Sequence, residues 1–312
     1  MQLDIVVAFF VLGIIARVVK SDLELPKSLY QSLTIFLLVA IGLKGGVALS
    51  EHASLQLVPQ SLAVLALGLI LPLVAFPLLA RVGRFDNADA ASIAAHYGSV
   101  SVGTYAVAVA VLEARGIAYE VYFPLFVVLL EMPAIAVGIA LARNRGHKFH
   151  WPKLLHEMFC NQGIVLMTGS LLIGYWAGAR TETIIPLFGD LFHGVLALFL
   201  LQMGIVAADR IADIRMTAPF LSAFGVLMPL LGAACGALLG LQVGFSVGGA
   251  TLLAVLGASA SYIAVPAVMR NALPQANHGV AIAASLGITF PFNVLVGIPL
   301  YLLGVEWLSH IV

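Results

Sequence analysis

Two short clusters of glycine and hydroxyl-bearing residues lie inside long apolar stretches of the sequence, and these residues are the best suited to bind a ligand. The clusters together contain Gly98, Ser99, Ser101, Gly103, Thr104, Ser259 and Ser261. Glycine lowers helix propensity, and serine offers the backbone alternative hydrogen-bond partners. Irregular backbone at membrane depth is tolerated only where protein buries it or where it lines a polar cavity. We therefore predict that each cluster breaks a membrane helix at a binding site.

A broken helix attracts ions of both signs at the point of the break. The free N–H groups of its second half attract an anion, and the free carbonyls of its first half attract a cation. Hydroxyl groups can donate or accept hydrogen bonds, and glycine lets a ligand approach the backbone closely. Small residues also allow tight helix packing in membranes, but two clusters at matched positions favour binding. All seven residues are therefore predicted to bind a small anionic substrate.

Glu131 lies in the apolar run 127–133, where a carboxylate is costly and indicates a functional site. This carboxylate can bind sodium, carry a proton, or form a structural pair with Lys44. Other oxygen ligands of the kind that suits sodium occur in the second cluster and in the last apolar segment. The predicted sodium ligands are Glu131, Ser259, Ser261, Tyr262, Thr289 and Asn293. Sodium is the predicted coupling ion, with no cofactor and no other metal.

The composition is that of an integral membrane protein. Hydrophobic residues make up 62% of the chain and charged residues 10%, against roughly 25% charged in an average soluble domain. The net charge of zero gives no reason to expect a nucleic-acid partner. The length suits roughly ten helical spans of about 20 residues each in an all-α fold. The predicted spans are 3–19, 29–50, 57–80, 88–113, 119–142, 158–178, 188–208, 217–241, 246–270 and 278–308.

The two halves of the chain repeat one another. The serine clusters lie 160 residues apart (259 minus 99), and Glu131 has Thr289 as its counterpart before a shared proline motif. Five spans in each half is an odd number, so the halves must have opposite orientations. We predict inverted repeats of residues 1–142 and 158–312, joined by a cytoplasmic linker at 143–157. With the breaks in helices 4 and 9, this arrangement is typical of a secondary transporter.

Positive charge orients the predicted spans. Twelve of the 15 lysine and arginine residues fall in the odd-numbered loops, and the exceptions are Lys44, Arg115 and Arg180. By the positive-inside rule, the odd loops are cytoplasmic and both termini lie outside. We expect a multi-pass protein of a bacterial-type inner (plasma) membrane.

The sequence resembles the SbtA-type sodium-dependent bicarbonate transporters over the whole chain. The most specific motifs are Gly98–Thr104, Ala258–Ser261, Pro266–Arg270 and Leu273–Asn277. The resemblance implies ten helices in inverted repeats, with a gate domain of helices 1, 2, 6 and 7 and a core domain of helices 3–5 and 8–10. It also implies a homotrimer and a PII-like cytoplasmic regulator as a partner.

The sequence departs from the cyanobacterial members of this family at three points. Tyr262 and Glu131 each stand where those proteins carry an aspartate, and the linker at 143–157 is much shorter. The predicted function is sodium-coupled symport of a small anion, with bicarbonate as the foremost substrate. One alternative is a sodium/proton antiporter or an organic-acid symporter of the same crossed-helix class. Another is a ligand-binding membrane sensor, although the sequence shows no signalling domain.

An enzyme is not predicted. His96 beside Ser99 and Ser101 resembles fragments of an intramembrane serine protease. That class needs its nucleophile and its base on different helices, whereas these residues share one segment. We predict instead that His96 forms a hydrogen bond to a neighbouring helix.

Overall fold

The computed structural model describes residues 4–142, 156, 159–214 and 219–311, and all regular structure in these ranges is helical. Six helices are long and apolar enough to cross a membrane, which confirms the predicted class of all-α membrane protein. They are α2 (Lys27–His52), α3 with the π-helical turn η1 (Leu57–Val82), α6 (Pro124–Leu141), α10 (Phe192–Ile214), α11 (Pro219–Gln242) and the composite last helix (His278–Ser309).

Shorter helices complete the bundle. They are α1 (Ile5–Val18), α8 (Gln162–Ala177), the 3₁₀ turn η2 (Gly178–Thr183) and α9 (Ile185–Asp190). The side chain of Asp4 caps α1 by accepting from the N–H of Val6, and Asn161 caps α8 in the same way through Gly163. Each cap satisfies a backbone donor that has no partner within its helix.

Two further helices are interrupted in the middle, where the sequence predicted the breaks. The first consists of α4 (Asn87–His96) and α5 (Val102–Ala114), separated by non-helical residues 97–101. The second consists of α12 (Val247–Gly257) and α13 (Ala264–Ala272), separated by residues 258–263. Each interruption coincides with a serine cluster, because those residues weaken the helix on both sides.

The last membrane helix is irregular in a way that the sequence analysis did not predict. It consists of α14 (His278–Ile282), η3 (Ala283–Thr289), α15 (Phe290–Phe292), η4 (Asn293–Gly297) and α16 (Ile298–Ser309). Both η3 and η4 are π-helical. A proline follows each π-helical turn closely, at Pro291 and Pro299, and a proline lacks the N–H that the α-helical ladder requires.

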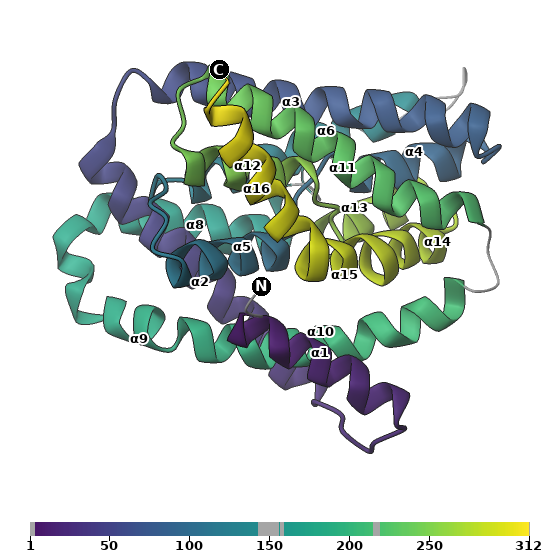
Figure 1. Ribbon diagram of the computed structural model, residues 1–312, viewed down its shortest axis with the longest axis horizontal. Coiled ribbons are helices and arrows are strands. Elements are labelled where there is room, and N and C mark those ends of the chain that lie inside the picture. The colour runs from purple at the N-terminus through teal and green to yellow at the C-terminus, as the bar shows by residue number, and fades with distance from the viewer. Residues whose placement is uncertain (1–3, 143–155, 157–158, 215–218, 312) are drawn as a thin grey trace.

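Glycine allows two pairs of helices to cross at very short range. Figure 1 shows α1 lying against α10 at the lower edge of the molecule. Gly13 of α1 and Gly204 of α10 meet at this crossing, and a methyl group on either would overlap a carbonyl oxygen of the other helix. Gly46 of α2 and Gly174 of α8 meet in the same way. Small residues are the usual means of close helix approach in membranes.

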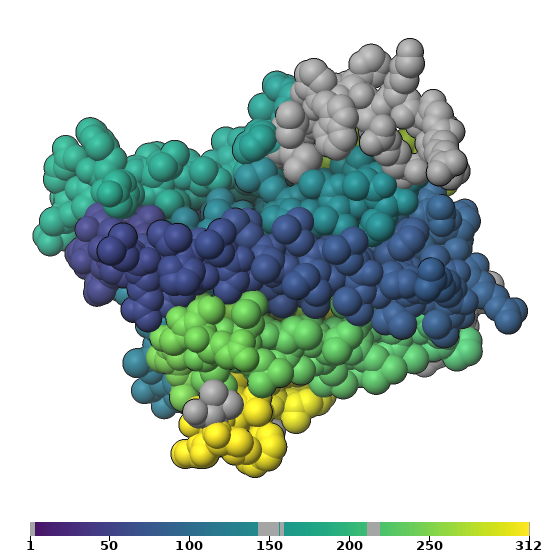
Figure 2. Space-filling model, turned by 90° about the horizontal axis from the view of Figure 1, so that it is seen from above, coloured from purple at the N-terminus to yellow at the C-terminus, as the bar shows by residue number. Residues whose placement is uncertain are grey.

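The opposite face of the molecule is formed by α3 and α11. Figure 2 shows them as blue and green bands that run side by side across this face, with the yellow α16 beyond α11. Beneath them, α6 contacts both α3 and α4, so the first break lies inside the bundle. His96, Ser99, Ser101, Ser259 and Ser261 are accordingly all buried.

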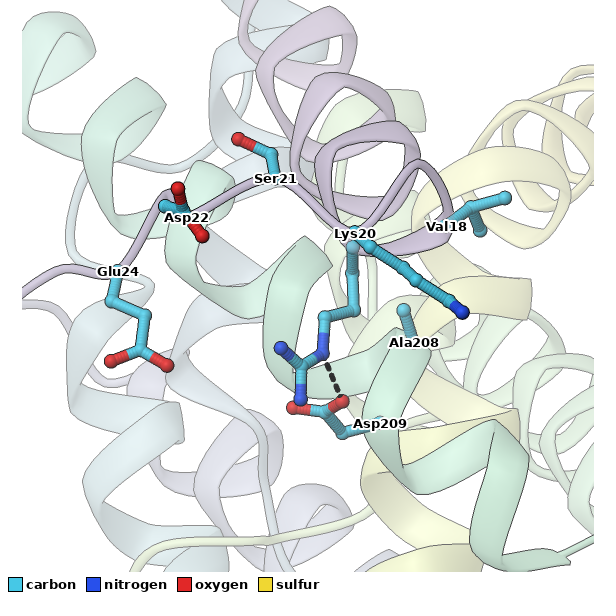
Figure 3. A pocket seen from close by; sticks show the side chains of 8 residues that line it. Val18, Lys20, Ser21, Asp22, Glu24, Ala208 and Asp209 are labelled. Atoms are coloured by element: carbon cyan, nitrogen blue, oxygen red, sulfur yellow. Dashed lines mark hydrogen bonds and ion pairs between the residues drawn. The ribbon is translucent and has the colours of Figure 1, made fainter.

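An open cavity of about 740 Å³ lies where α1 ends against α10. The Arg17 guanidinium pairs with Asp209 across this junction, and Lys20, Asp22 and Glu24 surround the opening (Figure 3). Charged side chains of both signs are expensive inside a bilayer but common at its surface. This cavity therefore marks a water-exposed end of the helix bundle.

Substitution of Gly46 by alanine is expected to destabilise the protein by about 1–3 kcal/mol, since the methyl group would overlap the Leu171 carbonyl oxygen. Gly304 is the matched control, because a methyl group there has no atom within 4 Å and a helical Gly→Ala change is otherwise favourable by up to about 1 kcal/mol. Thermal unfolding in detergent should show a lower Tm for Gly46→Ala alone. Equal Tm values for the two variants would contradict the close crossing.

Candidate functional site

The two helix breaks are joined directly to each other at His96. The N–H of Ser261 donates to the His96 carbonyl oxygen at 2.9 Å, and the His96 ring nitrogen Nδ1 lies 2.6 Å from the Ser261 carbonyl oxygen. A carbonyl can only accept, so Nδ1 carries the proton. The His96 side chain is 0% exposed. His96, the last residue of α4, is thus hydrogen-bonded to the second break at Ser261. The predicted hydrogen bond from His96 to a neighbouring segment is confirmed.

The first break ends in a capped helix N-terminus. The Ser101 hydroxyl oxygen accepts from the Thr104 N–H at 3.1 Å and from the Thr104 hydroxyl at 2.8 Å. Val102 and Gly103 are the first two residues of α5, so their N–H groups have no acceptor within the helix. Two N–H donors and the positive end of the helix dipole form an anion-binding feature.

Tyr262 of the second break lies against this N-terminus. A methyl group on Gly103 would come within 2.5 Å of the Tyr262 hydroxyl oxygen and 3.0 Å of a Phe199 ring carbon. Gly103 is therefore needed for the close approach of the second break to α5 and not only for flexibility. A tyrosine at this position places a neutral hydroxyl beside the α5 N-terminus, where an aspartate would place a negative charge.

A cavity of about 10 Å³ lies between the breaks. Four predicted site residues line it, namely Ser101, Glu131, Ser261 and Tyr262. Leu38 of α2 and Gly163 of α8 close it from the other side. Such a volume holds about one water molecule or one bare ion. Residues from five segments that are distant in the sequence therefore meet at a site of ionic size.

Among the described residues, Glu131 is the only acidic one in the lining of this cavity. Its side chain is 4% exposed, and its carboxylate oxygen Oε2 has no hydrogen-bond partner in the described part of the chain. The structural pair with Lys44 is absent there too, because the Lys44 ammonium instead lies 5.0 Å from the centre of the Phe192 ring. An unpartnered buried carboxylate strongly favours a bound cation or a proton.

The remaining predicted residues are not part of the cavity lining. The Ser99 hydroxyl donates to the Glu131 carbonyl oxygen at 3.4 Å, and the Ser259 hydroxyl donates to the Val255 carbonyl oxygen at 2.7 Å. These hydroxyls satisfy backbone carbonyls of α6 and α12, as serine commonly does in membrane helices.

Thr289 and Asn293 are occupied by protein contacts. The Thr289 hydroxyl donates to the Gly225 carbonyl oxygen at 2.7 Å and accepts from the Tyr97 hydroxyl at 2.8 Å. The Asn293 amide donates to the Ala258 carbonyl oxygen at 2.8 Å, and its oxygen accepts from the Tyr301 hydroxyl at 2.7 Å. Thr289 and Asn293 are therefore hydrogen-bonded to residues of the two breaks, and neither lines the cavity.

Leu38, Gly163, Tyr97 and Tyr301 are not among the residues predicted from the sequence. Leu38 and Gly163 carry no chemical signal, because an apolar residue and a glycine are ordinary in membrane helices. The two tyrosines have a detectable signal, since a buried phenol usually needs a hydrogen-bond partner. The partner of Tyr97, however, lies on another helix, and that of Tyr301 lies eight residues away in the same last helix, so both are known only from the fold.

Comparison with known proteins assigns this architecture to a family. Residues 5–306 match the sequence profile of the Na⁺-dependent bicarbonate transporter superfamily, which is nearly the whole chain. The chain belongs to this superfamily. No curated protein matches the sequence. The resemblance found from the motifs is thereby confirmed at the level of the family.

Ser101 and Thr104 provide a test of the anion site in this bicarbonate-transporter superfamily protein. Thr104→Ala removes one hydroxyl and leaves the Ser101 oxygen bonded to the backbone N–H, so the fold should persist. Ser101→Ala also removes the α5 cap, at a cost of about 0.5–2 kcal/mol. A hydrogen bond to a charged ligand is worth about 1.5–3 kcal/mol, so both changes should raise the KM for the anion roughly ten-fold or more. Unchanged transport kinetics in both variants would place the anion elsewhere.

Proposed function

We propose that the protein is a sodium-coupled symporter of a small anion, and that the anion is bicarbonate. The proposal depends above all on one observation. The Glu131 carboxylate, whose oxygen Oε2 has no partner among the described residues, and the N-terminal end of α5 line the same small cavity. One feature attracts a cation and the other an anion. A volume of about 10 Å³ holds one bare ion, so the site must widen when the anion binds beside sodium.

The two ions help each other to enter a site of low polarity. A single ion there would lose most of its hydration without compensation, whereas an adjacent ion of opposite charge offsets part of the loss. In this mechanism the anion accepts from the N–H groups of Val102 and Gly103, and sodium binds at Glu131. Ser101, Ser261 and Tyr262 supply further oxygen atoms between them. Binding of one ion therefore promotes binding of the other, which couples their transport.

We further propose the ten-helix inverted repeat, with the α4/α5 and α12/α13 pairs as helices 4 and 9. The two glycine crossings support it. Gly13 and Gly174 are 161 residues apart (174 minus 13), and Gly46 and Gly204 are 158 apart (204 minus 46). These offsets agree with the 160-residue offset of the serine clusters. The α1–α10 crossing is therefore the counterpart of the α2–α8 crossing, as a pseudo-two-fold axis in the membrane plane requires.

Contacts between other helices follow the same rule. The methyl position of Gly68 in α3 faces the Leu130 side chain of α6, and that of Gly225 in α11 faces Ile288 of η3. Leu130 and Ile288 precede Glu131 and Thr289, which are themselves counterparts in the repeat. A shared contact at matched positions supports a common ancestral packing of the two halves.

The cavity lies between the groups of helices predicted as gate and core. Leu38 and Gly163 belong to gate helices, whereas Ser101, Glu131 and Ser261 belong to the core. Movement of the core against the gate would expose the cavity to each side in turn.

We also propose that the protein lies in a bacterial-type inner membrane with both termini outside. We further propose that it forms a homotrimer and binds a PII-like cytoplasmic regulator. Of the predicted linker at 143–157, the structure describes only His156, so Arg145 lies outside the described residues.

Uptake of radiolabelled bicarbonate into proteoliposomes tests the proposal. Proteoliposomes should accumulate labelled bicarbonate when an inward sodium gradient is applied. An equal gradient of potassium or choline should give only the uptake seen in empty liposomes. Sulfate and a small carboxylate such as pyruvate, tested as competitors, define the anion class. Sodium-independent uptake would refute the coupling, and no bicarbonate uptake in any cation would refute the substrate.

A further inference from the structure

A second cavity, of about 370 Å³, lies along the same helices as the small ion-sized cavity. On α2 its lining includes Lys44, which is six residues beyond Leu38. On α5 it includes Tyr105 and Glu113, which follow Val102 of the small cavity, and on α6 it includes Pro124. An α-helix rises 1.5 Å per residue, so six residues correspond to about 9 Å. The two cavities therefore lie about 9 Å apart along α2, and both are lined by α2, α5 and α6.

The larger cavity opens toward the end of the bundle that the charge bias assigns to the exterior. Its lining extends along α2 to Glu51, just before the loop at 53–56, and includes Tyr119 of the loop between α5 and α6. Both of these loops are even-numbered in the predicted order of spans. A solute that enters from outside would thus reach this cavity before it reaches the ion-sized cavity.

Glu51 and Glu113 are the acidic residues in the described lining of this cavity, and Glu113 already has partners. The Tyr119 hydroxyl donates to one Glu113 oxygen at 2.8 Å, and the His193 ring nitrogen Nε2 lies 3.3 Å from the other. Burial and the nearby Glu113 carboxylate raise the pKa of Tyr119, so its hydroxyl remains protonated and continues to donate. Glu113 is thereby held on the α5 side of the cavity.

Lys44 is held on the opposite side without a carboxylate. Its ammonium lies 5.0 Å from the centre of the Phe192 ring, and no carboxylate within the described ranges lies within 4.0 Å of it. The aromatic face attracts the ammonium and holds it against the wall of the cavity. An ammonium has three hydrogen-bond donors, and a ring engages its charge without accepting conventional hydrogen bonds from all three. Lys44 therefore presents an available positive group to an anion in the cavity.

We propose that Lys44 is the outer recruitment residue for the transported anion, which it binds in the 370 Å³ cavity before the anion moves to the N-terminus of α5. This inference rests on the proposed function, and it adds a second binding position and a specificity-determining residue to it. A lysine that merely extended toward the lipid surface would face away from the core helices. Lys44 instead faces a cavity that core residues share.

The test compares bicarbonate kinetics of Lys44 variants in proteoliposomes. Lys44→Met keeps the length of the side chain and removes its charge, and it should raise the KM for bicarbonate roughly five- to ten-fold with little change in kcat. Lys44→Arg should retain most of the wild-type KM. The KM for sodium should be unchanged in both. The wild-type kcat/KM for bicarbonate should also fall with ionic strength more steeply than that of Lys44→Met.

Arg115→Met is the matched control, because Arg115 is an exposed cation at the same end of α5 that does not line the cavity. It should leave the KM for bicarbonate within two-fold of the wild type. A KM of Lys44→Met within two-fold of the wild type refutes the recruitment role. An equal rise in Lys44→Met and Arg115→Met refutes it as well, because the effect would then come from surface charge alone.

Cysteine labelling tests the position of Lys44 independently of transport. In a background with Cys160 and Cys235 replaced by serine, Lys44→Cys should react with a membrane-impermeant thiol reagent from outside. Attachment of an aminoethyl group restores the charge and should lower the KM, whereas a sulfonatoethyl group should raise it further. An unreactive cysteine overturns the outer position. Absence of bicarbonate uptake by the wild type refutes the proposed function itself and is thus a distinct result.

Discussion

Replacement of Glu131 by glutamine is expected to lower the sodium affinity of transport about a hundred-fold or more. Glutamine keeps the size of the side chain and one acceptor oxygen but removes the charge. Removal of one partner from a buried ion pair costs about 3–5 kcal/mol, and 1.4 kcal/mol is a factor of ten. Uptake at a fixed bicarbonate concentration should then show a weak, unsaturated dependence on sodium. Sodium titration in proteoliposomes measures this directly.

Thermal melting separates this role from the other two possible roles of Glu131. Sodium should raise the Tm of the wild type relative to choline, because a ligand at 100 times its Kd adds about 2.7 kcal/mol of stability. Glu131→Gln should lose this rise while keeping the Tm that the wild type has in choline. The carboxylate oxygen Oε2 has no partner among the described residues, so the substitution breaks no internal pair. A lower Tm in choline would indicate a structural acid instead.

A proton-carrying Glu131 would give a third pattern. Glu131→Gln would then lose the pH dependence of uptake and keep the wild-type response to sodium. Glu306→Gln is the matched control, since Glu306 is a carboxylate in α16 that does not line the cavity. It should behave as the wild type in sodium titration, pH titration and melting.

Substitution of Gly103 by alanine is expected to abolish most bicarbonate uptake. The added methyl group would lie 2.5 Å from the Tyr262 hydroxyl oxygen and 3.0 Å from a Phe199 ring carbon, so the two breaks must separate. Overpacking of this kind costs about 1–3 kcal/mol, and here the displacement falls on the anion-binding N-terminus of α5. If this cost falls on anion binding, the KM for bicarbonate should rise roughly five-fold to a hundred-fold, since 1.4 kcal/mol is a factor of ten.

A second substitution identifies the cause of this loss. Tyr262→Phe removes the oxygen atom that the Gly103 methyl group would meet first, so the double variant Gly103→Ala/Tyr262→Phe should recover part of the uptake. Gly169→Ala is the control in α8, where an added methyl group has no neighbour within 4 Å. A double variant that is no better than Gly103→Ala would locate the obstruction at Phe199 and not at Tyr262.

The sequence by itself determined the class of the protein and the positions of the two breaks. Both depend on local properties that need no fold. A chain with 62% hydrophobic and 10% charged residues cannot remain soluble as a single domain, and glycine with serine weakens a helix wherever it occurs. The motifs were also sufficient to identify the family, because Gly98–Thr104 and Ala258–Ser261 are short, contiguous patterns.

Only the tertiary structure decided which oxygen atoms face the ion-sized cavity. Glu131, Thr289 and Asn293 are equally plausible sodium ligands by residue type, but Thr289 and Asn293 are bonded to Gly225, Ala258 and two tyrosines. The direction of a side chain depends on how each helix is rotated against its neighbours. That rotation results from the packing of many residues, and no single residue type specifies it.

The same reason explains Lys44. Its sequence context, Gly42-Leu43-Lys44-Gly45-Gly46, is compatible with a side chain that extends to the membrane surface or with a partner for Glu131. The close glycine crossing of α2 with α8 fixes how α2 is rotated, and this turns Lys44 toward α5 and Phe192. Local composition thus determined where the chain breaks, whereas long-range packing decided which groups meet at the breaks.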